Sequence, residues 1–406
     1  IEGARNNGQL TVHGEKIAAL KLIASMYENN GFQPLWQESG LSDQLLDAVR
    51  NAREEGLNPA DYHYEVLSRM LSTPVDSTID NIGLELLLSD AFFRLAYHYQ
   101  FGRTEPEKIF ITWNFTRNIG QTDPHDLLKQ AIDTGRIKKA LNNLLPQNQH
   151  YQGLKHWLAR YRNLAANGGW PALPDDLRLE PGMNHPYVVL LRNRLQVIGY
   201  YSGAKSGQDS EFYNSELVLS VLDFQRRHGI EPDGVVAAET LAALNVPIEE
   251  RIDQIRVNME RLRWVSQSLR NDYLLVDIAG FSVTLYQDGQ LTWKTRAIVG
   301  RPYRRTPVFR ASMTYMVLNP NWTVPRTILH EDILPKVKRD RAALIEKNLL
   351  VIDPLGQEVD PNKIDWDKFP ASYRGYKLRQ PPGPDNTLGR IKFMFPNPYV
   401  VYLHDT

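Results

Sequence analysis

The sequence predicts a multidomain α+β protein, with a helical N-terminal region, a bundle of three short helices, and a mainly antiparallel β region at the C-terminal end. A chain of 406 residues, 42% of them apolar, is too long for one hydrophobic core. Apolar residues recur every three or four positions in the first two regions and every second position beyond residue 264. A stretch rich in Gly and Pro, residues 168–182, separates the first two regions.

The first region, from Lys16 to about Tyr161, is predicted to be all helical. Apolar residues in it share helix faces, as in the run Leu84, Leu87, Leu88, Ala91 and Leu95. Its breaks fall at residues 56–59, where Asn58 or Asp61 can cap a helix, and at Gly102.

The second region, between about Pro186 and Val246, shows three short helical patterns. Their apolar faces are Leu191, Leu195 and Ile198, then Leu217, Val221 and Phe224, then Leu241 and Leu244. Asp233-Gly234 supplies a turn before the third helix. Arg192, Arg194, Arg226 and Arg227 could contact polymer carboxylates, although interspersed charge is more often a solvated surface.

The third region follows a further helix at about residues 251–264. We expect strands in four runs: Tyr273 to Ile278, Phe281 to Tyr286, Leu291 to Val299, and Met313 to Leu318. Asp288-Gly289 predicts a hairpin turn. Between about 325 and 380 the β pattern lapses into a charged, mostly helical insertion, followed by loops that carry Trp366, Tyr373 and Tyr376. Strands are expected again at residues 391–395 and 399–404.

The overall charge does not favour a nucleic-acid or membrane-surface protein. Forty-seven basic and 47 acidic residues give a net charge of zero, so no bulk field attracts a polyanion. The 406 residues contain no apolar run of membrane-spanning length and no leader pattern. Because the chain begins at Ile1 rather than Met, we expect it to be a fragment that has lost any signal or anchor.

Cysteine and histidine usage limits the chemistry within these residues. There is no cysteine, which excludes disulfides, thiolate zinc sites and a cysteine nucleophile in this stretch. The ten histidines form no His-Glu-x-x-His pair and do not cluster with carboxylates at ligand spacing. We therefore expect no metal site.

The run Tyr399 to His404 is the first candidate site. As a strand it would point Tyr402 and His404 to the same side. On spacing alone, His404 is more often a satisfied histidine at a strand end than a catalytic one.

Two loops are further candidates. Residues 300–307 place Arg301, Arg304 and Arg305 between prolines, which suits a carboxylate ligand or, more often, a solvated hairpin. Residues 319–325, Asn-Pro-Asn-Trp-Thr-Val-Pro, would form either an aromatic cleft wall around Trp322 or an ordinary strand exit.

Segments in three regions of the sequence resemble known families of bacterial cell-wall enzymes. Leu190 to Gly199, Phe224 to Val235 and Thr240 to Asn245 resemble the three-helix peptidoglycan-binding domain. Ala297 to Pro307, Asn319 to Pro325 and Gly389 to Thr406 resemble, in order, the YkuD-like L,D-transpeptidase catalytic domain. Residues 56–62 and 90–103 resemble the scaffold domain of large YcbB-type murein L,D-transpeptidases. The resemblance implies a scaffold domain at 1–175, a peptidoglycan-binding domain at 183–248, and a catalytic domain at 255–406 with a capping insertion at about 325–380.

The resemblance also implies a reaction and its residues. His404 would serve as general base and acid for a cysteine in a Ser-x-Gly-Cys-x-Arg motif beyond Thr406. The thiolate would form a thioester with one stem peptide, and a diaminopimelate amine of a second would attack it to form a 3→3 cross-link. The thiolate chemistry that the resemblance implies needs neither a metal nor an organic cofactor. Expected substrate-binding residues are Tyr402, Trp322, Arg301, Asn319 and Thr406.

The partners implied are peptidoglycan stem peptides, with carbapenem β-lactams as inhibitors, other wall-synthesis enzymes, and no nucleic acid. A periplasmic location follows from the substrate. The insertion would be either a lid or a static insert. The alternative interpretation is a non-catalytic wall-binding protein.

Overall fold

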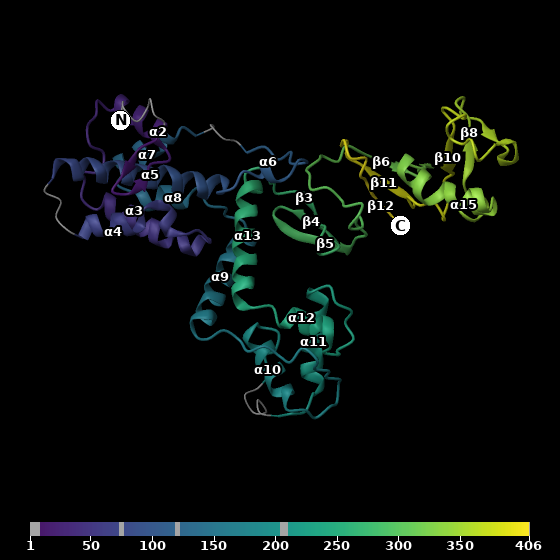
Figure 1. The fold of residues 1–406 in the computed structure, drawn as a ribbon, viewed down its shortest axis with the longest axis horizontal. Helices are drawn as coiled ribbons and strands as arrows, with labels where there is room; N and C mark the ends of the chain where they lie inside the picture. The colour runs from purple at the N-terminus through teal and green to yellow at the C-terminus, as the bar shows by residue number, and fades with distance from the viewer. Residues whose placement is uncertain (1–8, 73–76, 118–121, 204–209, 406) are drawn as a thin grey trace. The chain divides into compact units, whose positions relative to one another are not determined.

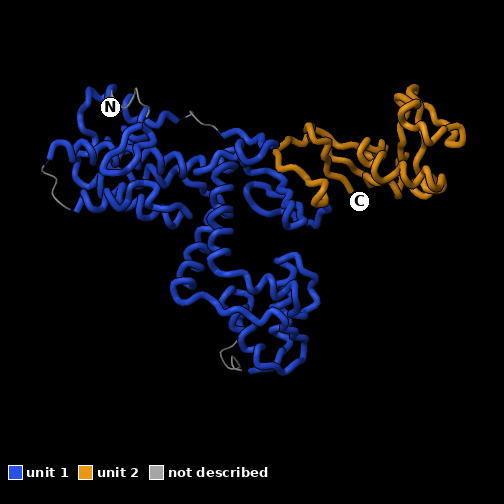
Figure 2. The backbone as a smooth tube through the Cα atoms, in the orientation of Figure 1, with its two compact units in different colours: residues 1–299 blue, residues 300–406 orange. Residues whose placement is uncertain are grey.

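The computed structural model describes residues 9–72, 77–117, 122–203 and 210–405. The chain divides into two compact units, residues 1–299 and residues 300–406, drawn in blue and orange in Figure 2. Figure 1 labels the helices and strands of both units. Among the described residues, none of the helices combines the length and apolar character needed to cross a membrane.

The first region of unit 1 is helical, as predicted. Its elements are β1 (Thr11–Val12), β2 (Glu15–Lys16), α2 (Leu20–Asn29), α3 (Leu41–Asn51), η1 (Ala52–Glu55), η2 (Pro59–Tyr62), α4 (Tyr64–Ser72), α5 (Thr78–Phe101), α6 (Pro106–Ile109), α7 (Pro124–Asp133), α8 (Ile137–Asn142) and α9 (Gln149–Ala166). Asn58 caps the turn at η2 by accepting a hydrogen bond from the Ala60 amide, which confirms one of the two expected caps.

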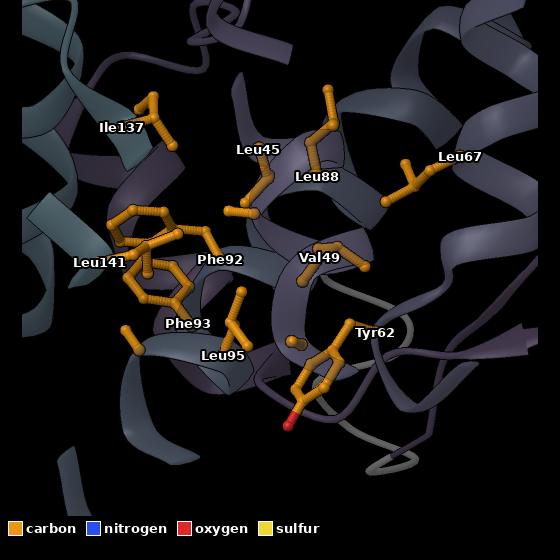
Figure 3. Close-up of a cluster of buried hydrophobic side chains, with 14 of the residues drawn as sticks. Leu45, Val49, Tyr62, Leu67, Leu88, Phe92, Phe93, Leu95, Ile137 and Leu141 are labelled. Atoms are coloured by element: carbon orange, nitrogen blue, oxygen red, sulfur yellow. The ribbon is translucent and has the colours of Figure 1, made fainter. Parts of the chain in front are cut away.

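Helix α5 lies at the centre of the core of this region. It is buried on all sides over its middle turns, because α2, α4, α7 and α13 (Ile248–Ser266) pack against it as well as α3 and α8. Figure 3 shows this packing, with labelled side chains of α5 beside those of α3 and α8: Leu88, Phe92, Phe93 and Leu95 of α5, Leu45 and Val49 of α3, and Ile137 and Leu141 of α8. The periodic apolar run seen in the sequence is therefore core.

One carboxylate is buried in this apolar core. Asp90 of α5 has no exposed surface, and its Oδ1 accepts hydrogen bonds from the amides of Ala18 and Ala19 at 2.8 and 2.6 Å. These amides precede α2, whose own N-cap residue provides no side-chain hydrogen bond. Oδ2 lies 2.8 Å from Nε2 of His63, so Asp90 joins α5 to the start of α2 and to the end of η2.

The second region of unit 1 is a three-helix bundle, as predicted. Its helices are α10 (Tyr187–Val197), α11 (Ser215–Arg227) and α12 (Ala238–Leu244), and they share a separate hydrophobic core. Gln225 holds the turn at residues 233–235 by hydrogen bonds to Asp233, Gly234 and Val235. Gly234 has φ +76°, a conformation that glycine adopts without strain.

Unit 1 ends with a long helix and a small sheet. Helix α13 (Ile248–Ser266) returns to the first core, where Met259 is fully buried. Strands β3 (Tyr273–Asp277), β4 (Ser282–Gln287) and β5 (Gln290–Arg296) form an antiparallel sheet in that order. Asp288 and Gly289 both have positive φ, as a type I′ hairpin turn requires, so the predicted turn is confirmed.

Unit 2 contains two antiparallel sheets. One has the order β12-β11-β6, formed by β6 (Tyr315–Leu318), β11 (Ile391–Met394) and β12 (Leu403–His404). The other has the order β7-β10-β8-β9, formed by β7 (Trp322–Thr323), β8 (Leu350–Ile352), β9 (Glu358–Val359) and β10 (Lys377–Gln380). The predicted antiparallel β class is confirmed for this part of the chain.

The insertion contains the helical part that the sequence predicted, but short strands lie where only loops were expected. Its helical part consists of α14 (Arg326–Ile328), η3 (Leu329–Ile333), α15 (Leu334–Arg339) and α16 (Ala342–Glu346), and η4 (Pro361–Lys363) follows later. The rest contributes β8, β9 and β10, and Trp366 is only 4% exposed within a hydrophobic core of the insertion. The sequence did not predict these strands because they are only two to four residues long, too short for a periodic pattern.

Candidate active site

His404 lies on β12 in the first sheet of unit 2, with an exposed side chain. Its Nδ1 is 2.6 Å from the carbonyl oxygen of Asp405. A carbonyl can only accept, so this contact places the hydrogen on Nδ1 and leaves the lone pair of a neutral imidazole on Nε2. An exposed Nε2 lone pair is the form of histidine that can remove a proton from a thiol or an amine.

The predicted strand from Tyr399 to His404 is wrong over most of its length. Only Leu403 and His404 pair with β11, and Val400 has φ +57°, which no strand residue adopts. The side chain of Asn397 explains the departure. Its Nδ2 donates to the carbonyls of Phe395 and Val401, both at 2.7 Å, and its Oδ1 accepts from the amides of Tyr399 and Val401. Asn397 thus closes a turn that leads directly into the histidine.

Replacing Asn397 should therefore disturb the site without touching His404. In Asn397→Ala all four hydrogen bonds are lost, and we expect local destabilisation of about 1–3 kcal/mol from the unsatisfied backbone groups. Asn397→Asp keeps the oxygen acceptor and should lose less. Hydrogen exchange of the amides at residues 399–404 measures the difference, and equal protection in both variants and the parent would contradict this role.

Lys392 is a neighbour of His404 that the sequence did not single out. It is the β11 residue directly opposite His404, and opposite residues of antiparallel strands project from the same face. Its Nζ lies 3.7 Å from the centre of the Tyr402 ring, a cation–π contact. Burial lowers the pKa of the Lys392 ammonium. The residue lies inside a predicted strand, but only the register between β11 and β12 shows what it faces.

Gly389 has a specific steric role at the same end of the sheet. Its φ is +62°, and a Cβ at this position would overlap the side chain of Asp405, the residue after His404. A glycine is therefore needed where the two segments approach each other.

Residues 300–307, the loop that carries three arginines, form a closed turn rather than an open ligand-binding loop. The amide of Gly300 donates to Oγ1 of Thr306 at 2.8 Å, and a Cβ on Gly300 would collide with the Arg304 carbonyl. Hydrogen bonds to Asp332 and Glu331 of η3 raise the pKa of Arg304, so this guanidinium already has carboxylate partners. Arg301 is exposed, and its Nη1 donates to the hydroxyl of Tyr303 at 3.0 Å.

The other expected site residues lie in different places. Asn319 follows β6, and its amide donates to the Arg390 carbonyl, so it lies in the His404 sheet but on the far side of β11. Trp322 lies on β7 of the other sheet, half-buried against the core of the insertion. Thr406 is outside the described residues. The structure thus brings together Tyr402, His404 and Lys392, and it does not bring Trp322 into the same sheet.

The described residues contain no group of three or more His, Cys, Asp or Glu side chains that could hold a metal ion.

Comparison with protein families assigns this part of the chain. Residues 271–406 match the YkuD family model, described as an L,D-transpeptidase catalytic domain. Over this region the chain is similar to the YkuD family. The YkuD region is accompanied by a match of residues 184–244 to a "Putative peptidoglycan binding domain" and of residues 21–158 to a scaffold domain. The expected combination of catalytic, binding and scaffold modules is therefore confirmed.

A curated relative agrees with the YkuD match. The "Putative L,D-transpeptidase" of Haemophilus influenzae is 38% identical over 159 residues, which are 39% of this chain. The chain covers 32% of that relative, about a third of its length.

Proposed function

We propose that this chain is part of an L,D-transpeptidase that forms 3→3 cross-links between peptidoglycan stem peptides. The observation that supports the proposal most strongly is the YkuD match over residues 271–406, which includes His404. The imidazole on β12, with its exposed side chain and its Nδ1 contact to the Asp405 carbonyl, is suited to general acid–base catalysis. The subfamily of large YcbB-type enzymes is part of the same proposal.

The first half-reaction is acylation of a cysteine supplied by sequence that follows Thr406. Nε2 of His404 takes the thiol proton, and the thiolate attacks the carbonyl that joins diaminopimelate to the terminal D-Ala of the donor peptide. The carbon–nitrogen bond breaks, the imidazolium returns the proton to the amine, and D-Ala leaves. The product is a thioester between the enzyme and the donor stem.

The second half-reaction transfers the acyl group. The side-chain amine of an acceptor diaminopimelate attacks the thioester while His404 removes a proton from the nitrogen. The carbon–sulfur bond breaks, and a new amide joins the two stems. This chemistry uses the residues of the protein alone and needs no redox partner.

The remaining site residues are proposed to hold the two peptides. Tyr402 and Lys392 border His404, and the ammonium of Lys392 suits a stem-peptide carboxylate. Arg301, Asn319, Trp322 and Thr406 are proposed to contact the stems farther from the reacting carbonyl. The insertion is proposed to cap the site around His404. Its own hydrophobic core is consistent with movement as one body. The site of action is the periplasm, where stem peptides are accessible.

The proposal is tested by intact-protein mass spectrometry of the full-length gene product after incubation with a carbapenem. A thiolate opens the β-lactam ring and stays acylated, so we expect one covalent adduct on a cysteine. Absence of an adduct on folded, full-length protein would overturn the enzymatic proposal. It would favour instead a non-catalytic wall-binding protein that keeps the module at residues 184–244.

A further inference from the structure

A cleft of about 290 Å³ lies in unit 1, between the three-helix bundle and the helices α9 and α13. This volume is at the lower end of the range of ligand pockets, about 300–1,000 Å³. Its walls come from four parts of the sequence: α9, Trp170 in the linker after it, the bundle, and the N-terminal part of α13. The part of the chain that matches the binding-domain family therefore forms only one side of the cleft.

Aromatic side chains line the cleft on both sides. Trp157, Tyr161 and Trp170 form a chain of edge-to-face contacts, with ring centres 5.6 and 5.5 Å apart. Tyr200 faces them from the bundle and packs against Phe224 at 5.2 Å. The two Trp and three Tyr or Phe rings differ in burial: Phe224 is buried, whereas the other four are half-buried. Part of each of those four rings is therefore open to a ligand.

Helix α9 packs against the turn that follows α10 of the bundle. Gly199 has φ +86°, and a Cβ there would lie 3.5 Å from the Trp157 ring. The guanidinium of Arg160 donates to the Val197 carbonyl at 2.9 Å and lies over the Trp157 ring. Trp157 is thus held in place against the bundle, and one side of it faces the cleft.

The charge of the cleft is positive. Its described lining holds Arg194 and Arg251 and no Asp or Glu. Arg194 lies 3.6 Å over the Trp170 ring, and it donates to the Leu244 carbonyl through Nε and Nη2. Its buried Nη1 has no partner among the described residues. Burial lowers the pKa of Arg194 to about 9, which leaves it charged at neutral pH.

Aromatic rings beside guanidinium groups suit a particular ligand chemistry. The C–H faces of sugar rings pack on aromatic side chains, and carboxylate substituents pair with arginine. We infer that this cleft binds an amino-sugar chain bearing carboxylates, and that α9 and α13 complete the binding surface of the bundle. The inference rests on the proposed function, in which peptidoglycan is the polymer recognised.

The experiment is co-sedimentation of the full-length protein with purified peptidoglycan sacculi. Asn258 is exposed on α13 and lines the cleft, so Asn258→Trp should fill it at the loss of one hydrogen bond, from Nδ2 of Asn258 to the Gln254 carbonyl. Val257, the exposed neighbour on the same helix, does not line the cleft, and Val257→Trp is the matched control. We expect Asn258→Trp to weaken binding by at least about thirty-fold, the size of a binding hot spot, and Val257→Trp to bind like the parent.

Two further variants and one altered probe complete the test. Tyr200→Ala removes an aromatic face and should weaken binding in the same direction, with circular dichroism to verify folding. The parent protein should co-sediment less with sacculi whose carboxylates have been amidated than with untreated sacculi. Parent-level binding by Asn258→Trp and Tyr200→Ala would overturn the inference. Failure of the parent itself to bind sacculi would instead count against peptidoglycan as the polymer in the proposed function. Carbapenem acylation should be unchanged in Val257→Trp.

Discussion

Replacing His404 by alanine in the full-length protein is expected to slow acylation by a carbapenem by about 10²–10⁴-fold, the usual contribution of a positioned general base. The reason is geometric. The Asp405 carbonyl fixes the hydrogen on Nδ1, and the exposed Nε2 is then the atom that accepts the thiol proton. Without it, only the small fraction of thiolate present at neutral pH can react. Time-resolved intact-protein mass spectrometry measures the rate.

The matched control for this variant is His156→Ala. His156 is an exposed histidine on α9, in unit 1, so its removal changes the composition equally without altering β12. We expect its acylation rate to equal that of the parent. An unchanged rate in His404→Ala, with the protein folded, would make His404 an ordinary strand-end histidine and would refute its proposed role as base.

Replacing Asp90 by alanine is expected to give the largest loss of stability, about 3–5 kcal/mol, as for removal of one partner from a buried charged network. The variant leaves two amides before α2 without an acceptor and the buried Nε2 of His63 without its carboxylate. Hydrogen exchange in α2 and α5 is the appropriate measurement, because a multidomain chain has no single unfolding free energy.

The control for Asp90 is Asp80→Ala on the same helix. Asp80 is 42% exposed and lies 3.3 Å from His13, so the ion pair is screened by water and its loss should cost less than about 1 kcal/mol. Equal protection of α2 in Asp90→Ala and Asp80→Ala would show that the buried carboxylate does not hold the start of that helix.

The sequence predicted those parts of the fold in which local physical chemistry is decisive. Long runs of helical spacing predicted α5 and α13, and the bundle followed from three short amphipathic faces around Asp233-Gly234. Asp288-Gly289 predicted the β4–β5 hairpin, because few other residue pairs adopt two successive positive φ angles. The site residues stay a prediction: the motif ending at His404 indicated a candidate catalytic histidine with Tyr402 as its neighbour.

Other features depended on contacts between residues distant in the sequence, and only the tertiary structure decided them. The turn made by Asn397 interrupts a run that alternates like a strand, because a side chain that bonds four backbone groups outweighs a weak local preference for strand. Trp366 belongs to a core because strands from three separate segments assemble around it. Lys392 faces His404 because of a register between β11 and β12, and the aromatic cleft exists because α9, the bundle and α13 converge. Spacing along a chain specifies which face a residue occupies, whereas strand register and helix packing determine what that face meets.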